Sequence, residues 1–419
     1  MPAIKQGLGY DVLTAARERI RYTFDHFEAV YVSFSAGKDS SVLMHLVLAE
    51  AIRRGRKVGI LLIDLEAQYA LTIQHAEQMF SLYARYIDLY WVCLPIKLRN
   101  AVSNFEPVWC AWDPDRKADW VRPLPVHPGV IADPSHFDFF SPRMEFEEFI
   151  ELFAAWYSRG RETAACIGIR ADESLNRFRT IAVWDKEMHC GKRYTTKVTD
   201  HVYNVYPIYD WHVTDIWKYH AQYPDKPHNE VYDRMHLAGV PLHQMRLCQP
   251  YGDDQKRGLW LYHLLEPQTW GKVVARVNGA NSGALYIEEH GNVTGYNKII
   301  LPPGHTWKSF CNLLLATMPD VTRDHYLPRF RAWLEGWHRR GYRTGIPDEA
   351  PRTLEKKYWS PSWRRLCKVL LRNDWWCKGL GMQQPKSVAY EKYLAMKRER
   401  TGKTNGRLHG STHDTQATT

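Results

Sequence analysis

The segment AVYVSFSAGKDSS, residues 29–41, decides the fold of this chain. Its first six residues are typical of a buried β-strand, and apolar residues recur at helical spacing directly after it. A strand that leads through a turn of small residues into a helix N-terminus forms an anion site, because free N–H groups and the positive end of the helix dipole point at one place. Gly37 lets the backbone approach a phosphate, Lys38 supplies charge, and two hydroxyl donors follow at Ser40 and Ser41.

Strands and helices alternate beyond this turn, which predicts an α/β fold. Continuous apolar strands joined by helices indicate a parallel sheet that is covered on both faces. The pattern places strands at 29–34, 57–64, 87–94 and 164–169, with helices at 40–54, 72–86 and 145–157. After residue 207 helical spacing dominates, at about 213–223, 228–238, 255–265, 269–277, 306–317, 324–340 and 361–373.

Four regions are expected along the chain. They are an N-terminal helix within 1–27, an α/β domain over 28–225, a mostly α-helical C-terminal domain over 226–400, and a disordered tail over 401–419. The α/β domain carries a Trp- and Pro-rich insertion at about 104–142, which is too irregular for regular elements and resembles a loop that covers a substrate.

Composition limits the classes of protein that the chain can represent. Among 419 residues, 56 Lys and Arg against 46 Asp and Glu give a net charge of +10, which favours an anionic partner. No apolar run reaches the roughly 18 residues that a membrane span needs, and residues 1–10 lack the apolar core of a signal peptide. The eight cysteines contain no Cys-x-x-Cys pair, which favours reduced thiols and a cytoplasmic location.

The turn itself matches neither of two common phosphate motifs. It is not Gly-x-x-x-x-Gly-Lys-Ser/Thr and not Gly-x-Gly-x-x-Gly, so a Walker NTPase and a Rossmann dehydrogenase are disfavoured. The alternative is that the turn only caps the following helix at Asp39 or Ser40, a task that needs a single polar side chain.

Four ordered motifs resemble a known family. SAGKDS at 35–40 resembles the Ser-Gly-Gly-Lys-Asp-Ser pyrophosphate loop (PP-loop) of the adenine nucleotide alpha-hydrolase-like superfamily, whose domain is Rossmann-like. LIDLE at 62–66, GIRADES at 168–174 and YPIYDW at 206–211 with Asp215 and Trp217 resemble its phosphoadenosine phosphosulfate (PAPS) reductase family. The second half, including CQPYGDDQ at 248–255, resembles the branch of immunoglobulin-binding regulator A and YbdN-like proteins.

This resemblance implies a nucleotide site. Its catalytic residues would be Lys38, Asp39 and Arg170. The residues that would bind the nucleotide are Ser33, Phe34, Ser35, Ala36, Gly37, Lys38, Asp39, Ser40, Ser41, Asp64, Glu66, Gly168 and Arg170. Arg177 or Arg179 would assist Arg170.

The carboxylates of this set have more than one interpretation. A carboxylate such as Asp39 repels phosphates unless a cation intervenes, so the resemblance implies Mg²⁺ held by Asp39 and Asp64. Asp64 and Glu66 would bind the ribose or the metal, and the alternative for Glu66 is a cap of the following helix. Asp172 and Glu173 would orient Arg170, or else begin a helix.

The implied chemistry is cleavage or substitution at a nucleotide phosphate. One hypothesis is an ATP pyrophosphatase that transfers AMP to an acceptor, in sulfur-transfer-type chemistry. The alternatives are a PAPS reductase that uses an external thiol and a nucleotide-sensing regulator without turnover. A PAPS reductase needs a reactive cysteine in a Glu-Cys-Gly-Leu-His setting, whereas Cys367 reads as a buried structural thiol and Cys377, beside Lys378, as one of lowered pKa.

Other ligands have weaker signals. An iron–sulfur cluster would need four cysteines from distant segments, and His236, His243 and Cys248 match no strong zinc pattern. Nucleic acid is a further possible partner, because Arg364, Arg365, Lys368 and Arg372 form a basic stripe on a predicted helix. The branch also implies a partner regulator protein, and no membrane is expected.

Overall fold

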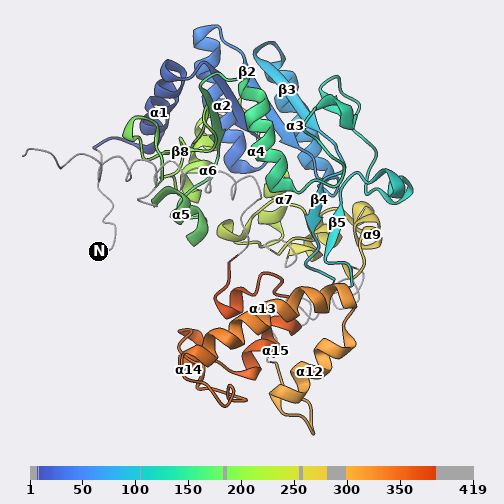
Figure 1. The fold of residues 1–419 in the computed structure, drawn as a ribbon. Coiled ribbons are helices and arrows are strands. Elements are labelled where there is room, and N and C mark those ends of the chain that lie inside the picture. The colour runs from blue at the N-terminus through green and yellow to red at the C-terminus, as the bar shows by residue number, and fades with distance from the viewer. Residues whose placement is uncertain are drawn as a thin grey trace, which may run out of the picture.

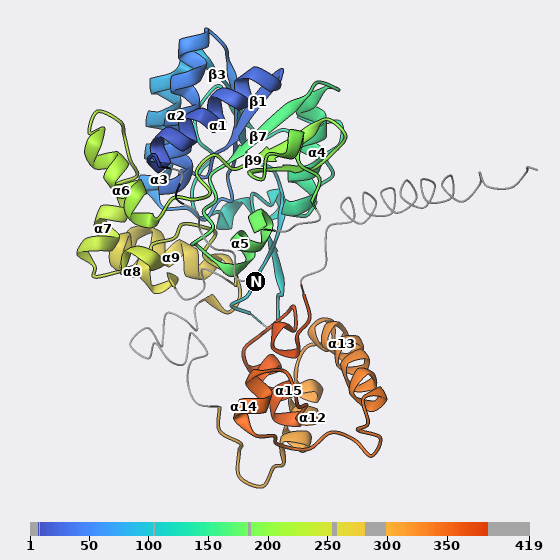
Figure 2. The ribbon, with the colours of Figure 1, turned by 90° about the vertical axis from the view of Figure 1, so that its left-hand side faces the viewer.

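The computed structural model describes residues 7, 9–103, 105–182, 186–253, 258–280 and 299–383 of the 419-residue chain. The expected tail over 401–419 lies outside these residues. The described part forms two units, an α/β unit and a smaller helical unit beneath it in the view of Figure 1. Figure 2 shows the same two units from the side.

The α/β unit contains nine strands in two sheets. The strands are β1 (Ala29–Ser33), β2 (Val58–Ile63), β3 (Ile87–Val92), β4 (Lys97–Arg99), β5 (Val108–Cys110), β6 (Val130–Ile131), β7 (Thr163–Ile167), β8 (Thr195–Lys197) and β9 (Val202–Val205). Seven of them form one sheet in the order β6-β3-β2-β1-β7-β9-β8, and β4 and β5 form an antiparallel hairpin. All neighbours in the large sheet are parallel except β8 and β9.

All helices except α5 and α14, for which no helix range was predicted, lie at predicted positions, with shifts of a few residues at most of their ends. Those of the α/β unit are α1 (Val12–His26), α2 (Lys38–Arg54), α3 (Ala70–Tyr83), α4 (Phe146–Ser158), α5 (Leu175–Ala182), α6 (Val213–Gln222), α7 (Val231–Leu237), α8 (Trp260–Leu265) and α9 (Pro267–Arg276). Those of the helical unit are α12 (Trp307–Thr317), α13 (Asp320–Arg339), α14 (Arg352–Lys356) and α15 (Trp363–Leu371).

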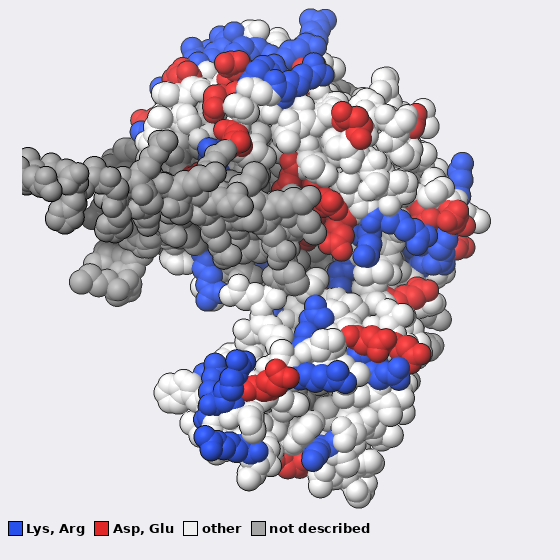
Figure 3. Space-filling model, in the orientation of Figure 1, with Lys and Arg blue, Asp and Glu red and all other residues white. Residues whose placement is uncertain are grey.

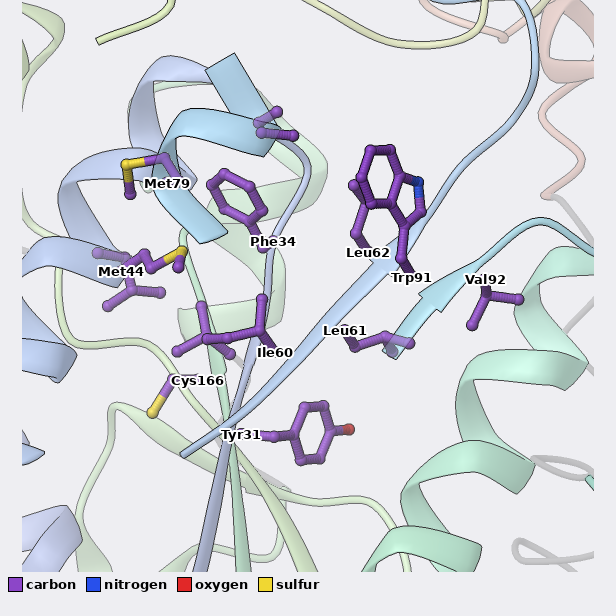
Figure 4. Close-up of a cluster of buried hydrophobic side chains, with 14 of the residues drawn as sticks. Tyr31, Phe34, Met44, Ile60, Leu61, Leu62, Met79, Trp91, Val92 and Cys166 are labelled. Atoms are coloured by element: carbon purple, nitrogen blue, oxygen red, sulfur yellow. The ribbon is translucent and has the colours of Figure 1, made fainter. Parts of the chain in front are cut away.

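The central strands are buried on both faces, as a parallel sheet requires. In Figure 4, Phe34, Met44 and Met79 lie on the side of α2 and α3, whereas Tyr31 points to the opposite side. There Tyr31 packs edge-on against Tyr157 of α4, whose hydroxyl donates to the Val30 carbonyl oxygen at 3.1 Å. Gly59 makes room for this ring, since a Cβ there would lie 2.6 Å from the Tyr157 hydroxyl oxygen.

The predicted α/β class and parallel sheet are confirmed, with three corrections. The insertion at 104–142 is not wholly irregular, because β5 forms half of the hairpin and β6 adds an edge strand to the sheet. The β8–β9 pair is antiparallel. The helices α7, α8 and α9 pack into the core of the α/β unit, so the core changes between Ala280 and Trp307 rather than at residue 226.

The two units meet at the β4–β5 hairpin. Asn373 of the helical unit donates to the carbonyl oxygens of Ala101 at 3.1 Å and Ser103 at 2.9 Å. Arg99 of β4 donates to the Asn373 side-chain oxygen at 3.1 Å and lies over the Trp375 ring at 4.6 Å. These buried polar contacts hold the helical unit on the α/β unit.

Candidate functional site

The order of the sheet places the predicted phosphate loop where ligands of α/β proteins bind. Strand order reverses at β1, because β2 and β7 flank it on opposite sides. Ligands of open α/β sheets bind outside the carboxyl ends of the strands at such a point. Residues 34–37 follow β1 at this point and residues 168–170 follow β7, so two of the predicted motifs meet there.

The loop after β1 is shaped as an anion site. Ala36 has φ of 55°, a left-handed conformation that glycine adopts most easily, and Gly37 is the N-cap of α2. Ser41 donates its N–H to the Gly37 carbonyl oxygen, but the N–H groups of Asp39 and Ser40 contact no acceptor among the described residues. Two backbone donors at the positive end of a 17-residue helix are therefore open to an anion.

Lys38 is buried and already has contacts in this structure. Its Nζ donates to the Met245 carbonyl oxygen at 3.0 Å, lies 3.1 Å from the Asp39 carboxylate and sits over the Tyr232 ring. Its N–H donates to the Tyr232 hydroxyl at 3.2 Å. A phosphate that binds at the loop would therefore replace Tyr232 and Met245 as partners of Lys38.

Arg170 is held against the same helix. Its Nε donates to Asp39 and its Nη1 to Asp172, and the side chain is 4% exposed. Gly168 permits this approach, because a Cβ there would lie 3.2 Å from backbone atoms of Asp39 and Ser40. Arg170 thus stands beside the phosphate loop, and its Nη2 contacts no acceptor within the described part of the chain.

The residues near Arg170 have separate roles. Asp172 also lies 3.1 Å from His212, so it bridges Arg170 and the N-cap residue of α6. Glu173 pairs with Arg177 at 3.0 Å, and its carbonyl oxygen accepts from Arg246 at 2.5 Å. Since α5 begins only at residue 175, neither Asp172 nor Glu173 lies within a helix. Arg179 is exposed and forms no ion pair among the described residues.

Asp64 lies at the end of β2 with its carboxylate fully occupied. It accepts hydrogen bonds from the Trp91 indole N–H at 2.9 Å, the Glu66 N–H at 3.0 Å and Arg122. Its side chain has no exposed surface. These contacts fix the turn after β2 and attach the inserted segment to it through Arg122.

Glu66 forms a buried ion pair rather than a helix cap. Arg276 of α9 donates to its two oxygens at 2.7 and 3.1 Å, and the N–H groups of Trp112 and Val121 donate at 2.8 and 3.0 Å. The N-terminus of α3 is instead capped by Glu266, which accepts from the Ala70 N–H at 3.0 Å. The helix-cap alternative for Glu66 is therefore wrong, and a ligand role would require it to give up four hydrogen bonds.

A Mg²⁺ ion does not fit the two carboxylates expected to hold it. Asp39 is neutralised by Lys38 and Arg170, and Asp64 by Arg122. A hard cation needs several free oxygen ligands, whereas these oxygens face cations and N–H donors. Across the described residues no group of three His, Cys, Asp or Glu side chains is arranged to hold a metal. His236, His243 and Cys248 therefore do not form a metal site in this structure.

Three buried side chains behind the loop support its shape. Asn229 donates to the Ala36 carbonyl oxygen at 2.9 Å and to Thr72 at 3.1 Å, which holds the left-handed turn. His75 contacts the Ser41 hydroxyl at 2.8 Å, and burial lowers the pKa of His75 to about 3, so the ring is neutral. Tyr232 completes the set at the start of α2.

Comparison with known proteins agrees with this geometry. The family model described as "Phosphoadenosine phosphosulfate reductase domain" matches residues 29–237. The model of a domain of unknown function, DUF3440, matches residues 239–360. Uncharacterized protein YbdN of Escherichia coli (strain K12) is 41% identical over 399 residues, which cover 94% of this chain and 96% of that protein. The chain belongs to the PAPS reductase domain family.

Solved structures of related fold are more distant from this PAPS reductase family member. A PAPS reductase from Candida auris is 14% identical, with a TM-score of 0.30, over 55% of this chain and 93% of that one. An FMN adenylyltransferase from Candida glabrata is 16% identical, with a TM-score of 0.33, over 53% of this chain and 57% of that one. Among the described residues no helix is both long and apolar enough to cross a membrane.

The late cysteines of this family member are both buried. Cys377 is buried, and this burial, with Asp374 nearby, raises the pKa of its thiol to about 12, so the expected lowering of its pKa is wrong. Cys367 is fully buried in the helical unit, as expected for a structural thiol. The exposed cysteines are Cys190 and Cys248.

The basic stripe also differs from the expectation. Arg364 and Arg365 of α15 are each 7% exposed, so they do not form part of an open helical face. Arg364 pairs with Glu349 at 2.8 Å and Glu355 at 3.1 Å. The spacing predicts the helix α15, but a helical pattern cannot show that residues outside the helix contact the same side.

Sequence reasoning missed the residues that come from the second half of the chain. They are Asn229, Tyr232, Met245 and Arg276. None belongs to a motif of its own, and Met245 acts through its backbone carbonyl, which any residue carries. The one usable signal was that two buried carboxylates, Asp64 and Glu66, required cationic partners.

Proposed function

We propose that this protein binds an adenine nucleotide at residues 35–41 and catalyses substitution at a phosphate of ATP, with transfer of AMP and release of pyrophosphate. The observation that carries the proposal is the pair of open N–H groups at Asp39 and Ser40, next to Lys38 and Arg170. Phosphoryl and adenylyl transfer need mainly alignment and charge neutralisation, which this arrangement supplies.

The residues of the loop and Arg170 have separate roles in the proposed reaction. The loop N–H groups and Ser40 hold phosphate oxygens, and Lys38 leaves the Met245 carbonyl oxygen to neutralise the pyrophosphate. Arg170 stabilises the charge that develops on the phosphate being attacked, while Asp39 keeps Arg170 and Lys38 in position. A divalent ion would arrive with the nucleotide as part of the substrate, because Asp39 and Asp64 are already paired.

The cellular setting and the acceptor belong to the same proposal. None of the eight cysteines forms a disulfide bond, which favours a reducing compartment such as the cytoplasm. The acceptor of AMP is a group that sulfur-transfer chemistry would modify. Nucleic acid and a partner regulator protein remain predicted binding partners.

Incubation of the full chain with ATP tests the reaction. We expect AMP and pyrophosphate, and we expect Lys38→Ala to weaken nucleotide binding about ten- to hundredfold, since a hydrogen bond to a charged group contributes about 1.5–3 kcal/mol. Lys57→Ala is the matched control, because Lys57 is an exposed lysine paired with Asp88 at the surface. Binding without turnover would instead support a nucleotide-sensing regulator, and equal binding by Lys38→Ala would contradict the site.

PAPS reduction is the second candidate, and one observation favours it. Cys248 is exposed and lies three residues after Met245, whose carbonyl oxygen contacts Lys38. In this reaction the Cys248 thiolate would attack the sulfur of PAPS, forming an S–S bond while the S–O bond to the nucleotide breaks. An external dithiol would then release sulfite and be oxidised to a disulfide. Release of sulfite by the wild-type chain but not by Cys248→Ser would establish this candidate over ATP cleavage.

A further inference from the structure

The helical unit contains a cavity of its own, well separated in sequence from the phosphate loop. It has a volume of about 800 Å³ and lies between α14, α15 and the segment 299–301. In Figure 3 Lys and Arg side chains gather on this unit over α14. Small-molecule sites have volumes of roughly 300–1,000 Å³, so the cavity has the size of a nucleotide site.

The lining of the cavity is strongly cationic. It includes three carboxylates, Glu349, Glu355 and Asp374. Against these stand six cationic side chains, Arg352, Lys356, Arg364, Arg365, Lys368 and Arg372, which leaves a net charge of +3. A bound anion with about three negative charges would balance this excess.

Two of the three carboxylates pair with a subset of the cations, and Asp374 accepts hydrogen bonds from the N–H groups of Lys378 and Gly379. Glu355 pairs with Arg364 at 3.1 Å and with Lys368 at 3.4 Å, and Glu349 pairs with Arg364 at 2.8 Å. In the described part of the chain, no carboxylate lies within ion-pair distance of Arg352, Lys356 or Arg365. The uncompensated charge therefore lies on the side of α14 and on the start of α15.

Arg365 is the most informative of these residues because it is buried without a carboxylate partner. Its guanidinium lies over the Tyr358 ring at 4.8 Å and donates to the Ser360 carbonyl oxygen at 3.4 Å. Burial lowers the pKa of Arg365, which means that the charged form is poorly solvated. A buried cation is costly unless something pairs with it, so an anion is the missing partner.

Arg364 supports the same conclusion. Its Nε is buried and has no hydrogen-bond partner among the described residues, although its other nitrogens are paired. Burial also lowers the pKa of Lys368 at the same wall. Apolar side chains complete the cavity, namely Ile299, Leu301, Trp307 and Val369.

We propose that this cavity binds a phosphorylated organic anion of nucleotide size, with its phosphates on Arg352, Lys356 and Arg365 and its organic part against the apolar wall. The site is distinct from the phosphate loop and does not depend on the function proposed there. A nucleic acid strand fits less well, because Arg364 and Arg365, which line the cavity, are each only 7% exposed.

Calorimetric titration of the full chain with ATP tests the proposal. Every variant in this titration also carries Lys38→Ala, so that the phosphate loop contributes little to the measured ATP binding. We expect Arg352→Gln/Lys356→Gln to weaken ATP binding about tenfold or more, because two charged contacts are lost. Both residues line the cavity and are exposed, so the fold should tolerate the change. The charge-matched control is Arg331→Gln/Arg339→Gln, at exposed positions of α13 outside the cavity, and its affinity should be unchanged.

Two further comparisons sharpen the result. Arg365→Met tests the interior cation and should also weaken binding about tenfold. Inorganic tripolyphosphate should bind the cavity more weakly than ATP, because it lacks an organic part for the apolar wall. Equal affinity of the cavity and control variants for ATP would overturn the proposal. The proposal would also be overturned if ATP did not bind and a single-stranded oligonucleotide bound instead, with an affinity that the cavity substitutions weaken.

Discussion

Replacement of Arg276 by methionine is the most informative perturbation of the framework around the site. Arg276 is 1% exposed and donates three hydrogen bonds, two to Glu66 and one to the Cys110 carbonyl oxygen at 2.7 Å. The substitution leaves the Glu66 carboxylate buried without a cation. Breaking a buried ion pair from one side costs about 3–5 kcal/mol.

The remaining contacts place the expected cost at the lower end of this range. The N–H groups of Trp112 and Val121 still donate to Glu66, and methionine fills part of the arginine volume. We therefore expect the free energy of unfolding to fall by about 3 kcal/mol. For a unit of this size that corresponds to a fall in Tm of about 6–12 °C.

A double-mutant cycle provides the assay. Urea titrations followed by tryptophan fluorescence give the free energy of unfolding for wild type, Arg276→Met, Glu66→Gln and the double variant. The double variant should be more stable than the sum of the single losses predicts, by at least about 1 kcal/mol, because neither charge is then left alone. Additive losses, or a loss below about 1 kcal/mol in Arg276→Met, would refute the ion-pair interpretation.

Three further predictions concern the loop and its support. Gly168→Ala should lower nucleotide affinity and stability by about 1–3 kcal/mol each, because the new Cβ meets rigid backbone at Asp39; unchanged values in calorimetry and thermal melts would show that the contact yields freely. Asn229→Ala should cost about 1–2 kcal/mol of stability and weaken nucleotide binding, since the Ala36 carbonyl oxygen loses its donor, and Asn229→Asp should not restore either quantity. The free energy of unfolding should fall as the pH falls from about 7 to about 4, by at most about 1.4 kcal/mol per pH unit for each buried histidine. The reason is that in this window the unfolded chain binds protons that the folded chain excludes. Urea titrations that show no dependence on pH across this range would contradict the prediction. The histidines concerned have pKa values lowered by burial to about 4, 3 and 4 at His45, His75 and His220.

The part of the fold that could be predicted from sequence is the part that repeats a local pattern. The strand, turn and helix at 29–54 follow from apolar spacing and from small residues at the turn, and the structure confirms them. The short strands β6 and β8 could not be predicted, because two or three residues carry too little periodicity. Their pairing depends on an existing sheet edge.

The site was predictable where motifs meet at strand ends and not where distant segments enter. Gly168 and Arg170 were found because they follow a strand of the same sheet, and carboxyl ends of parallel strands share one edge. The partner of Glu66 lies 210 residues further on, in a helix whose apolar spacing says nothing about the sheet. Arg364 and Arg365 likewise contact side chains and carbonyl oxygens of residues 349–360, which lie outside their own helix.

A structure of the full chain with a bound, non-hydrolysable ATP analogue tests the central claim most directly. We predict phosphate oxygens within hydrogen-bond distance of the Asp39 and Ser40 N–H groups, with Lys38 Nζ moved from the Met245 carbonyl oxygen to a phosphate. Glu66 should keep its contacts with Arg276. Phosphates bound elsewhere while Lys38 stays on Met245, or a nucleotide whose ribose displaces Arg276 from Glu66, would contradict this account of the site.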